Sequence, residues 1–492
     1  MKYISVKEAA NKWNVTERSV RNYCQNGKII GAYITGKTWL IPENASKPGI
    51  KEEITSDEGE IGGLIKFLNE SPVSFWAVDN AKKILQKAGY KELLEVENSK
   101  INKGDKIFFV RNGTSIVAMN IGKNITENNY PMHIIASHCD SPTFKVKPEC
   151  DSITDIYNKV NTEPYGGLIR STWLDRPLSI AGRVLIKQDN AIVSKLVNID
   201  RDLLIIPNLC IHFNRTVNDG YSYNPATDLQ PLMGQELGDE SLKILLGEEL
   251  VVDPNNIVNF DLYLYNREKA TLLGKNRDYI CSGRLDDLEC VYTSIKAFSE
   301  SNNDKAINIC YISDNEEVGS SSRQGADSDF LSSVVNRVVS SLGFSNGSLS
   351  ASIANSFMIS ADNAHAVHPN NPGITDSKNK CYMNKGIAIK FNAAQSYTSD
   401  AISASIFQQI CENSGVLYQF FTNRSDLRGG GTLGNILLSH MSLLSVDIGL
   451  PQLAMHSSYE TAGSKDVEYA INAFKKFYSS DINFRDNKII IK

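Results

Sequence analysis

The spacing of apolar and polar positions divides the sequence near residue 61. From there to the C-terminus, short apolar runs rich in β-branched residues alternate with longer stretches in which apolar residues recur at helical spacing. This alternation is typical of an α/β fold in which a mostly parallel central sheet is flanked by helices. We therefore predict that the chain from residue 61 onward forms an α/β body.

Residues 1–45 follow a different pattern. Ser5 and Glu8 have the spacing of a capping box, and the apolar residues that follow Ser5 fall on one helical face. Thr16 is suited to cap a second short helix, and the next segment, IIGAYITGKTWLIP, has the pattern of a small β-hairpin. Two short helices with a hairpin after them predict a winged helix-turn-helix domain. This stretch resembles the excisionase and MerR-like winged modules, and the polar residues 46–60 after it are predicted to form a linker.

Charge is distributed unevenly along the chain. The 492 residues carry a net charge of −5, whereas residues 1–50 hold eight Lys or Arg residues against three Glu residues, a net charge of +5 that leaves −10 for the rest. The small overall charge does not indicate a nucleic-acid or membrane partner for the whole molecule. The basic N-terminal segment indicates a separate partner for residues 1–45, and two remain open: DNA, or a protein on which the segment docks. The side chains expected to face DNA lie on the second helix: Arg18, Ser19, Arg21, Asn22 and Gln25.

The sequence also bears on the compartment. It contains no stretch of 18 apolar residues, and its N-terminus lacks the apolar core of a signal peptide. Its nine cysteines form no CxxC pair, a usage that fits a reducing environment. We therefore predict a cytoplasmic protein without a membrane partner.

Residues that can bind metal follow the apolar runs, where strands are expected to end. The segments and their polar residues are HIIASHCDSP with His138 and Asp140, INICYISDNEEVGS with Glu316 and Glu317, SFMISADNAHAVHP with Asp362, and PQLAMHSSYE with His456. A fifth segment, CSGRLDDLECVYTSIKAF, places Asp286 just before an amphipathic helix. In open α/β sheets the carboxyl ends of the strands form the ligand crevice, so these side chains are expected to meet at one edge.

This mixture of histidines and carboxylates suits a site for two zinc ions. Two ions about 3.5–4 Å apart need a bridging carboxylate together with further His, Asp or Glu ligands. One more carboxylate, not a ligand, must take a proton from the attacking water. Each piece alone, such as His-x-Asp or a Glu-Glu pair, is more often structural. Their joint occurrence favours a hydrolytic metal site.

In these segments the sequence resembles the aspartyl aminopeptidase and aminopeptidase I family of zinc metallopeptidases, from about residue 61 to the C-terminus. The blocks that carry the likeness occur in the family's order: SHCDSP, YGGLIRSTWLDRPLSIAGR, RLDDL, SDNEEVGS, SADNAHAVHPN, NKGIAIK and AMHSSYE. The resemblance implies two divalent metal ions, zinc above all, one held by His138 and Asp362, the other by Glu317 and His456, with Asp286 between them. It also implies that Glu316 is the general acid and base and that Asp140 orients His138.

The resemblance assigns three further residues to the substrate. Tyr397 matches a tyrosine that hydrogen-bonds the oxyanion, and Lys385 matches a lysine of the first side-chain pocket. His212 matches a histidine that is lent across a dimer interface to the neighbouring site. The glycine-rich loop RSDLRGGGTLGNI has Arg428 where the family usually has proline, so acidic and neutral first residues both remain open.

The family's architecture implies a catalytic domain in two parts, residues 61–142 and 276–492. Between them, residues 143–275 fit an inserted β-rich dimerisation domain, with β runs such as LSIAGRVLI and FDLYLY. The implied assembly is a dimer-based homo-oligomer, commonly a dodecamer. We expect a metal-dependent aminopeptidase acting on peptides. The alternative is an oligomeric DNA-binding transcriptional regulator that uses the aminopeptidase body as a scaffold or sensor.

Overall fold

The chain forms two compact units, Met1–Glu58 and Gly59–Lys492. The computed structural model describes residues 2–13, 15–25, 29, 31–36, 38–43, 45, 59–485 and 488–492. Most of the predicted linker, residues 46–58, therefore lies outside the described residues. Its last two residues differ from the prediction, because helix α3 already begins at Gly59.

The N-terminal unit contains two short helices and a small antiparallel sheet. Helix α1 (Val6–Trp13) begins with reciprocal hydrogen bonds, in which the backbone N–H of Ser5 donates to Glu8 at 2.7 Å and that of Glu8 donates to Ser5 Oγ at 3.2 Å. Among the described residues, the sheet has the order β1 (Tyr3–Ser5), β3 (Thr38–Pro42) and β2 (Tyr33–Thr35). Helix α2 (Glu17–Gln25) packs on α1, and the two helices share a small apolar core that includes Trp13 and Val20.

The larger unit is built around a mixed sheet, and its middle strands β21, β17, β7 and β16 run parallel. Within the described part of the chain this sheet has nine strands, in the order β20 (Tyr418–Phe421), β19 (Ile387–Lys390), β21 (Leu444–Gly449), β17 (Phe357–Ala361), β7 (Met132–His138), β16 (Ile307–Ser313), β6 (Ser115–Ile121), β5 (Lys106–Arg111) and β4 (Lys91–Glu92). Among these described strands, antiparallel pairings occur only toward the two sides of the sheet, at β19–β21, β16–β6 and β5–β6.

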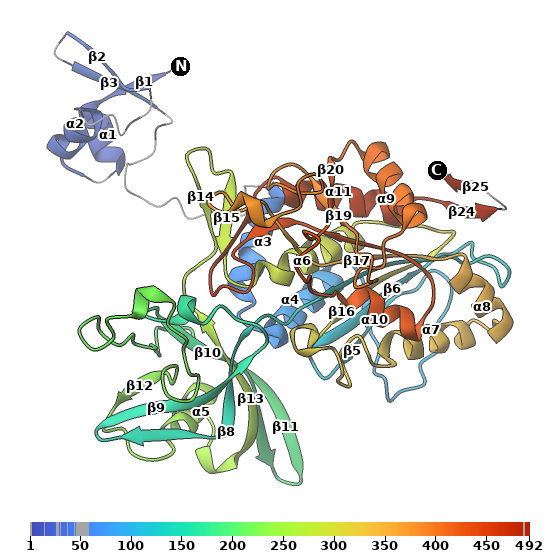
Figure 1. Ribbon diagram of the computed structural model, residues 1–492, viewed down its shortest axis with the longest axis horizontal. Helices are drawn as coiled ribbons and strands as arrows, with labels where there is room; N and C mark the ends of the chain where they lie inside the picture. The colour runs from blue at the N-terminus through green and yellow to red at the C-terminus, as the bar shows by residue number, and fades with distance from the viewer. Residues whose placement is uncertain are drawn as a thin grey trace. The chain divides into compact units, whose positions relative to one another are not determined.

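Helices cover both faces of this sheet (Figure 1). Alternate residues of β7 separate the two layers: His133 contacts the ring of Phe477, whereas Ile134 belongs to an apolar cluster with Phe330 and Leu437. The first layer contains α3 (Gly59–Glu70), α4 (Ser74–Lys87), α6 (Leu285–Ser299), α9 (Ala401–Ser414) and α11 (Asp466–Ser479), and the second contains α7 (Phe330–Ser341), α8 (Asn346–Ala354) and α10 (Leu433–His440). The sheet is thus buried on both sides, which explains its uninterrupted apolar strands.

A second, antiparallel sheet extends from the body (Figure 1). Its order is β11 (Ala191–Asn198), β10 (Leu178–Gln188), β13 (Ile257–Asn266), β8 (Thr143–Thr154), β9 (Tyr157–Tyr165) and β12 (Leu232–Gln235). Helix α5 (Ser241–Leu250) packs on it over an apolar core of its own. The sheet begins where the inserted domain is predicted to begin, at Thr143. However, β14 (Thr271–Leu273) lies within the predicted range 143–275 and pairs with β15 of another sheet.

That further sheet lies beside the carboxyl ends of the central strands. It has the order β14, β15 (Tyr279–Ser282), β23 (Glu460–Gly463), β22 (Pro451–Leu453) and β18 (Ala364–His365). The chain ends in a hairpin of β24 (Ile482–Arg485) and β25 (Lys488–Ile491). Of the helices that the structure describes, none is long and apolar enough to cross a membrane.

Candidate metal centre

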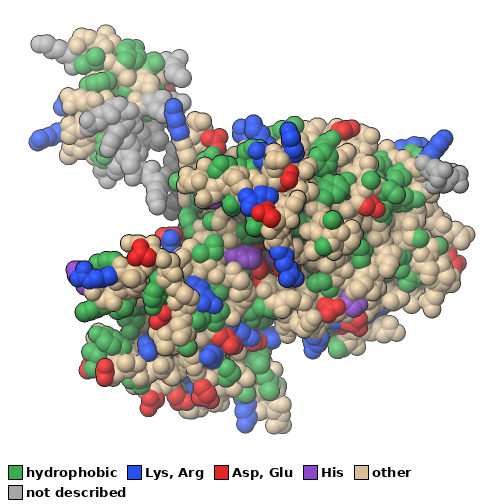
Figure 2. Space-filling model, viewed as in Figure 1, with side chains coloured by type: hydrophobic (Ala, Val, Ile, Leu, Met, Phe, Trp, Pro, Cys, Tyr) green, Lys and Arg blue, Asp and Glu red, His purple; other side chains and the backbone are tan. Residues whose placement is uncertain are grey.

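The predicted ligands converge at the carboxyl end of the central sheet. His138 is the last residue of β7, Asp362 directly follows β17, and Asp286 lies at the start of α6. Glu316 and Glu317 form a short turn, η4 (Glu316–Val318), after β16, and His456 lies between β22 and β23. All six residues line one open pocket. Figure 2 shows histidine surface in a hollow between the body and the inserted sheet.

Asp286 occupies the middle of this cluster. Its Oδ1 lies 3.6 Å from Nε2 of His138, and its Oδ2 lies 3.4 Å from Nε2 of His456. The same nitrogen of His456 lies 3.4 Å from Oε2 of Glu317. One carboxylate therefore has an oxygen near each histidine. A carboxylate so placed could share one metal ion with His138 and another with His456.

The donor set fits divalent metal. Atoms of His138, Asp286 and Glu317 lie within 4.8 Å of one another in the described chain. Asp286 Oδ1 and Glu317 Oε1 are buried and have no hydrogen-bond partner among the described residues. Buried acceptors without a donor are costly, so a bound cation accounts for them better than packing does. Imidazole and carboxylate ligands suit zinc.

Each histidine is oriented through its far ring nitrogen. Nδ1 of His456 lies 3.1 Å from the carbonyl oxygen of Gly167, and Nδ1 of His138 lies 3.1 Å from that of Asp140. If each Nδ1 carries the proton that these oxygens accept, Nε2 is left with its lone pair toward Asp286. Nδ1 of His138 is therefore closer to the backbone carbonyl oxygen of Asp140 than to its carboxylate Oδ1, which lies 3.5 Å away.

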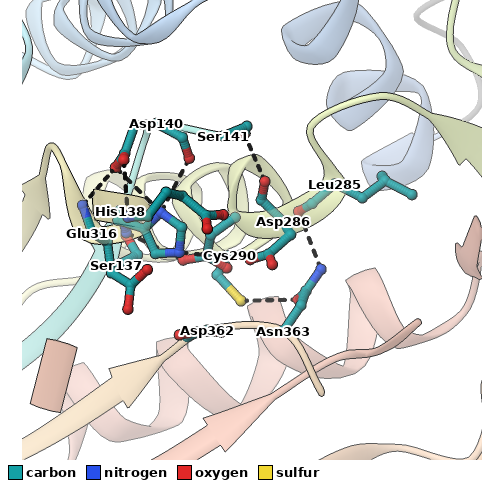
Figure 3. A network of polar contacts seen from close by, with 12 residues as sticks. Ser137, His138, Asp140, Ser141, Leu285, Asp286, Cys290, Glu316, Asp362 and Asn363 are labelled. Carbon is teal, nitrogen blue, oxygen red and sulfur yellow. Dashed lines mark hydrogen bonds and ion pairs between the residues drawn. The ribbon is translucent and has the colours of Figure 1, made fainter. Parts of the chain in front are cut away.

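The carboxylate of Asp140 holds the turn that carries the two glutamates (Figure 3). The backbone N–H of Glu316 donates to its Oδ1 and that of Glu317 to its Oδ2, each at 3.1 Å. The hydroxyl of Tyr165 also donates to Oδ2, at 2.7 Å. Sequence reasoning assigned Asp140 to His138 alone and missed this contact, because it depends on a turn from a different strand.

Glu316 has the properties of a general base. Its carboxylate lines the pocket and, unlike that of Glu317, forms no ion pair with His138 or His456 among the described residues. Burial raises the pKa of Glu316 to about 7; His138 opposes this rise, and the carboxylates of Asp362 and Asp140 add to it. A carboxylate with a pKa near neutrality can both accept and return a proton.

The three predicted substrate residues lie in different places. Tyr397 is buried and lines the pocket. Lys385 is exposed before β19 and does not line it. Lys390, at the other end of β19, does so instead: its Nζ lies 3.3 Å from Asp362 Oδ1 and 5.4 Å from the ring centre of Tyr397. His212 is exposed on the inserted domain and lies outside the pocket of its own chain.

Comparisons with known proteins agree with this site. The model of the family "Aminopeptidase I zinc metalloprotease (M18)" matches residues 67–478. A probable M18 family aminopeptidase 2 from Clostridium novyi is 45% identical over 425 residues, which cover 85% of this chain and 98% of that relative. Aspartyl aminopeptidase 1 of Schizosaccharomyces pombe is 37% identical and covers 87% of this chain and 96% of its own. The solved S. cerevesiae mApe1 dodecamer is 27% identical, with a TM-score of 0.75, and the match covers 86% of this chain and 97% of that one.

Proposed function

The chain belongs to the M18 family of aminopeptidase I zinc metalloproteases and is a metal-dependent aminopeptidase, and on this premise we propose that it removes acidic or neutral amino acids from the N-termini of peptides. The observation that carries the proposal is the buried cluster around Asp286, which turns one oxygen toward His138 and the other toward His456. The cluster lines a pocket, where a peptide could reach it.

We assign the ligands to two divalent ions, zinc above all. His138 and Asp362 would hold one ion, Glu317 and His456 would hold the other, and Asp286 would serve both. When bound, the ions polarise the scissile carbonyl and stabilise the negative charge that develops on its oxygen. The division of the ligands is supported by the short approach of His456 to Glu317.

The side chains around the metal positions carry out the proton transfers. Glu316 takes a proton from the attacking water and delivers it to the nitrogen of the leaving peptide. Asp140 keeps Glu316 in place through the backbone of the turn. The hydroxyl of Tyr397 is placed to donate a hydrogen bond to the oxyanion.

The choice of the first residue is assigned to Lys390 rather than to Lys385. Lys390 is the lysine that lines the pocket, and a cation there favours an aspartate or glutamate side chain. Part of its charge is already matched by Asp362 at 3.3 Å, so neutral first residues are also accepted. The S. pombe relative is described as an aspartyl aminopeptidase, which supports the acidic preference.

A panel of aminoacyl arylamides tests this function. We expect kcat/KM for Asp and Glu substrates to exceed that for Lys by at least about tenfold, since the positive side chain of a Lys substrate is repelled by Lys390. Each substrate is assayed with zinc, cobalt and manganese after removal of bound metal. Hydrolysis of none of the substrates with any of these metals would refute the activity, and a preference for Lys would refute the role of Lys390.

We propose that the enzyme is cytoplasmic and works as a dimer-based homo-oligomer, with a dodecamer as the complete assembly. The inserted domain, predicted as residues 143–275, would form the dimer, and His212 on its exposed surface would reach the neighbouring site. The proposal is supported by the related mApe1 structure, which is described as a dodecamer. Free thiols at all nine cysteines fit the cytoplasm.

The N-terminal unit lies outside the residues that match the M18 family, and we propose that it is a winged helix-turn-helix domain that binds DNA. The supporting observation is that Arg18, Arg21, Asn22 and Gln25 are all exposed on α2. Gel shifts of the full chain with genomic fragments should show binding that weakens with salt. Replacing Arg18 and Asn22 by Ala should reduce it without loss of peptidase activity. Absence of salt-sensitive binding would leave the unit as a protein-docking module.

A further inference from the structure

Glu460 is a buried carboxylate that lies beside the metal centre without belonging to the predicted ligands. It is the first residue of β23 and is only 2% exposed. Its Oε1 accepts the backbone N–H of His456 at 2.8 Å, and its Oε2 accepts the backbone N–H of Asp286 at 3.2 Å. One carboxylate thus joins two of the assigned metal ligands, which are 170 residues apart in the sequence.

The presence of a buried carboxylate at this position requires a physical explanation. Burying a charge is unfavourable unless hydrogen bonds compensate for it, and the negative charge of Asp286 disfavours the ionised form of Glu460 further. An apolar side chain would fill the same space at lower cost. However, it would leave the N–H groups of Asp286 and His456 without their acceptor.

The backbone of His456 depends on such support. His456 has φ 68° and Ala454 has φ 56°, in the left-handed region that residues other than glycine rarely adopt. Such backbone conformations are unfavourable and persist only where the surrounding structure holds them. The hydrogen bond from His456 to Glu460 is one of the contacts that hold this turn.

Glu460 is itself fixed by a chain of buried amides. The side-chain N–H of Gln452 donates to Glu460 Oε1 at 3.3 Å, and Asn363 donates to Gln452 Oε1 at 2.8 Å. Asn363 also donates to Glu289 Oε2, at 3.0 Å, and it directly follows Asp362. All four members are buried. The chain therefore connects the backbones that carry Asp286, Asp362 and His456.

We propose that Glu460 is a positioning residue that sets the separation of Asp286 and His456 and thereby the affinity of the metal position that His456 serves. This inference rests on the ligand assignment made above. Glu460 touches neither substrate nor the reacting atoms and acts only through the two backbone N–H groups. Both of its oxygens are needed, since each accepts from a different ligand residue.

Glu460→Gln tests this because the amide keeps the size of the side chain but has one acceptor oxygen instead of two. In the full-length zinc enzyme, we expect one of the two ions to be released at a chelator concentration about 10- to 100-fold lower than in the wild type, as is typical for groups that orient metal ligands. We expect kcat to fall while KM changes little. The cobalt-substituted enzyme should show an altered visible spectrum, which a purely structural role would not produce.

Asp466→Asn is the matched control. Asp466 is also buried and also accepts two backbone N–H groups, from Asn384 and Gly386, neither of which is an assigned ligand. We expect this variant to lose thermal stability but to keep its chelator profile and cobalt spectrum. Equal metal loss in both variants would overturn the inference, because any damaged buried carboxylate would then have the same effect.

Two more variants complete the test. If Glu460→Gln does not fold, Gln452→Met removes one hydrogen bond to the carboxylate and should still weaken the binding of the same ion several-fold. Wild-type metal affinity in every folded variant of Glu460 and Gln452 would overturn the inference. Asp286→Ala separates this failure from a failure of the site: if it also keeps both ions, the ligand assignment is wrong, and if it alone loses them, only the role of Glu460 is wrong.

Discussion

Glu316→Gln should lower kcat by roughly 10²- to 10⁴-fold, the usual contribution of a general base, while the metal content stays unchanged. The amide has nearly the shape of the carboxylate but cannot take up a proton. The backbone N–H of Glu316 still donates to Asp140, so the turn keeps its place. The measurement is kcat on an arylamide substrate together with metal analysis of the same preparation.

Glu317→Gln provides the contrast for that experiment. Its carboxylate lies 3.4 Å from His456 and is assigned to a metal ion, so this variant should lose metal as well as activity. Full activity of Glu316→Gln would exclude Glu316 as the base. Metal loss equal to that of Glu317→Gln would make Glu316 a ligand instead.

Gly449→Ala should lower kcat/KM by about 100-fold although the added methyl group touches no substrate. A Cβ at Gly449, the last residue of β21, would lie 2.1 Å from the carbonyl oxygen of Asp362 and 2.8 Å from Cε of Lys390. Backbone cannot yield as a flexible side chain can, so the strand end that carries Asp362 must move. A displacement of about 1 Å near reacting groups can reduce rates by about this factor. The overpacking should also cost about 1–3 kcal/mol of stability.

Gly347→Ala is the control for a glycine with room around it. Gly347 lies in α8, and a Cβ there would meet nothing within 4 Å. Alanine in a helix should leave activity unchanged and raise stability by about 0.5–1 kcal/mol. Both variants are compared by kcat/KM and thermal midpoint. Wild-type kinetics in Gly449→Ala would show that Asp362 is not held by this close approach.

The convergence of the candidate ligands could be predicted from sequence because most of them follow an apolar run. His138 and Asp362 end strands that are buried on both faces, and parallel strands place their carboxyl ends at one edge. The order of the segments along the chain supplied the rest of the prediction. The same reasoning extends to Asp286, since a polar start of an amphipathic helix is a local signal.

Other features depend on contacts that no local pattern contains. Lys385 precedes β19 and Lys390 is its last residue, and only the position of β19 in the sheet decides which of them reaches the pocket. The pairing of β14 could not be predicted either, because its sequence is as β-rich as the strands before it and it differs in its pairing partner, β15. Glu460 gave no signal, since its proposed role depends on joining the backbone of nearby His456 to that of Asp286, 174 residues away.

The inserted sheet reaches the metal centre at two points. Tyr165, the last residue of β9, donates to Asp140, and two residues later the carbonyl of Gly167 orients the ring of His456. A tilt of that sheet would therefore pull on both sides of the centre together. A contact at the far end of the sheet, from a neighbouring subunit or an engineered crosslink, would therefore be expected to change the activity from outside the pocket.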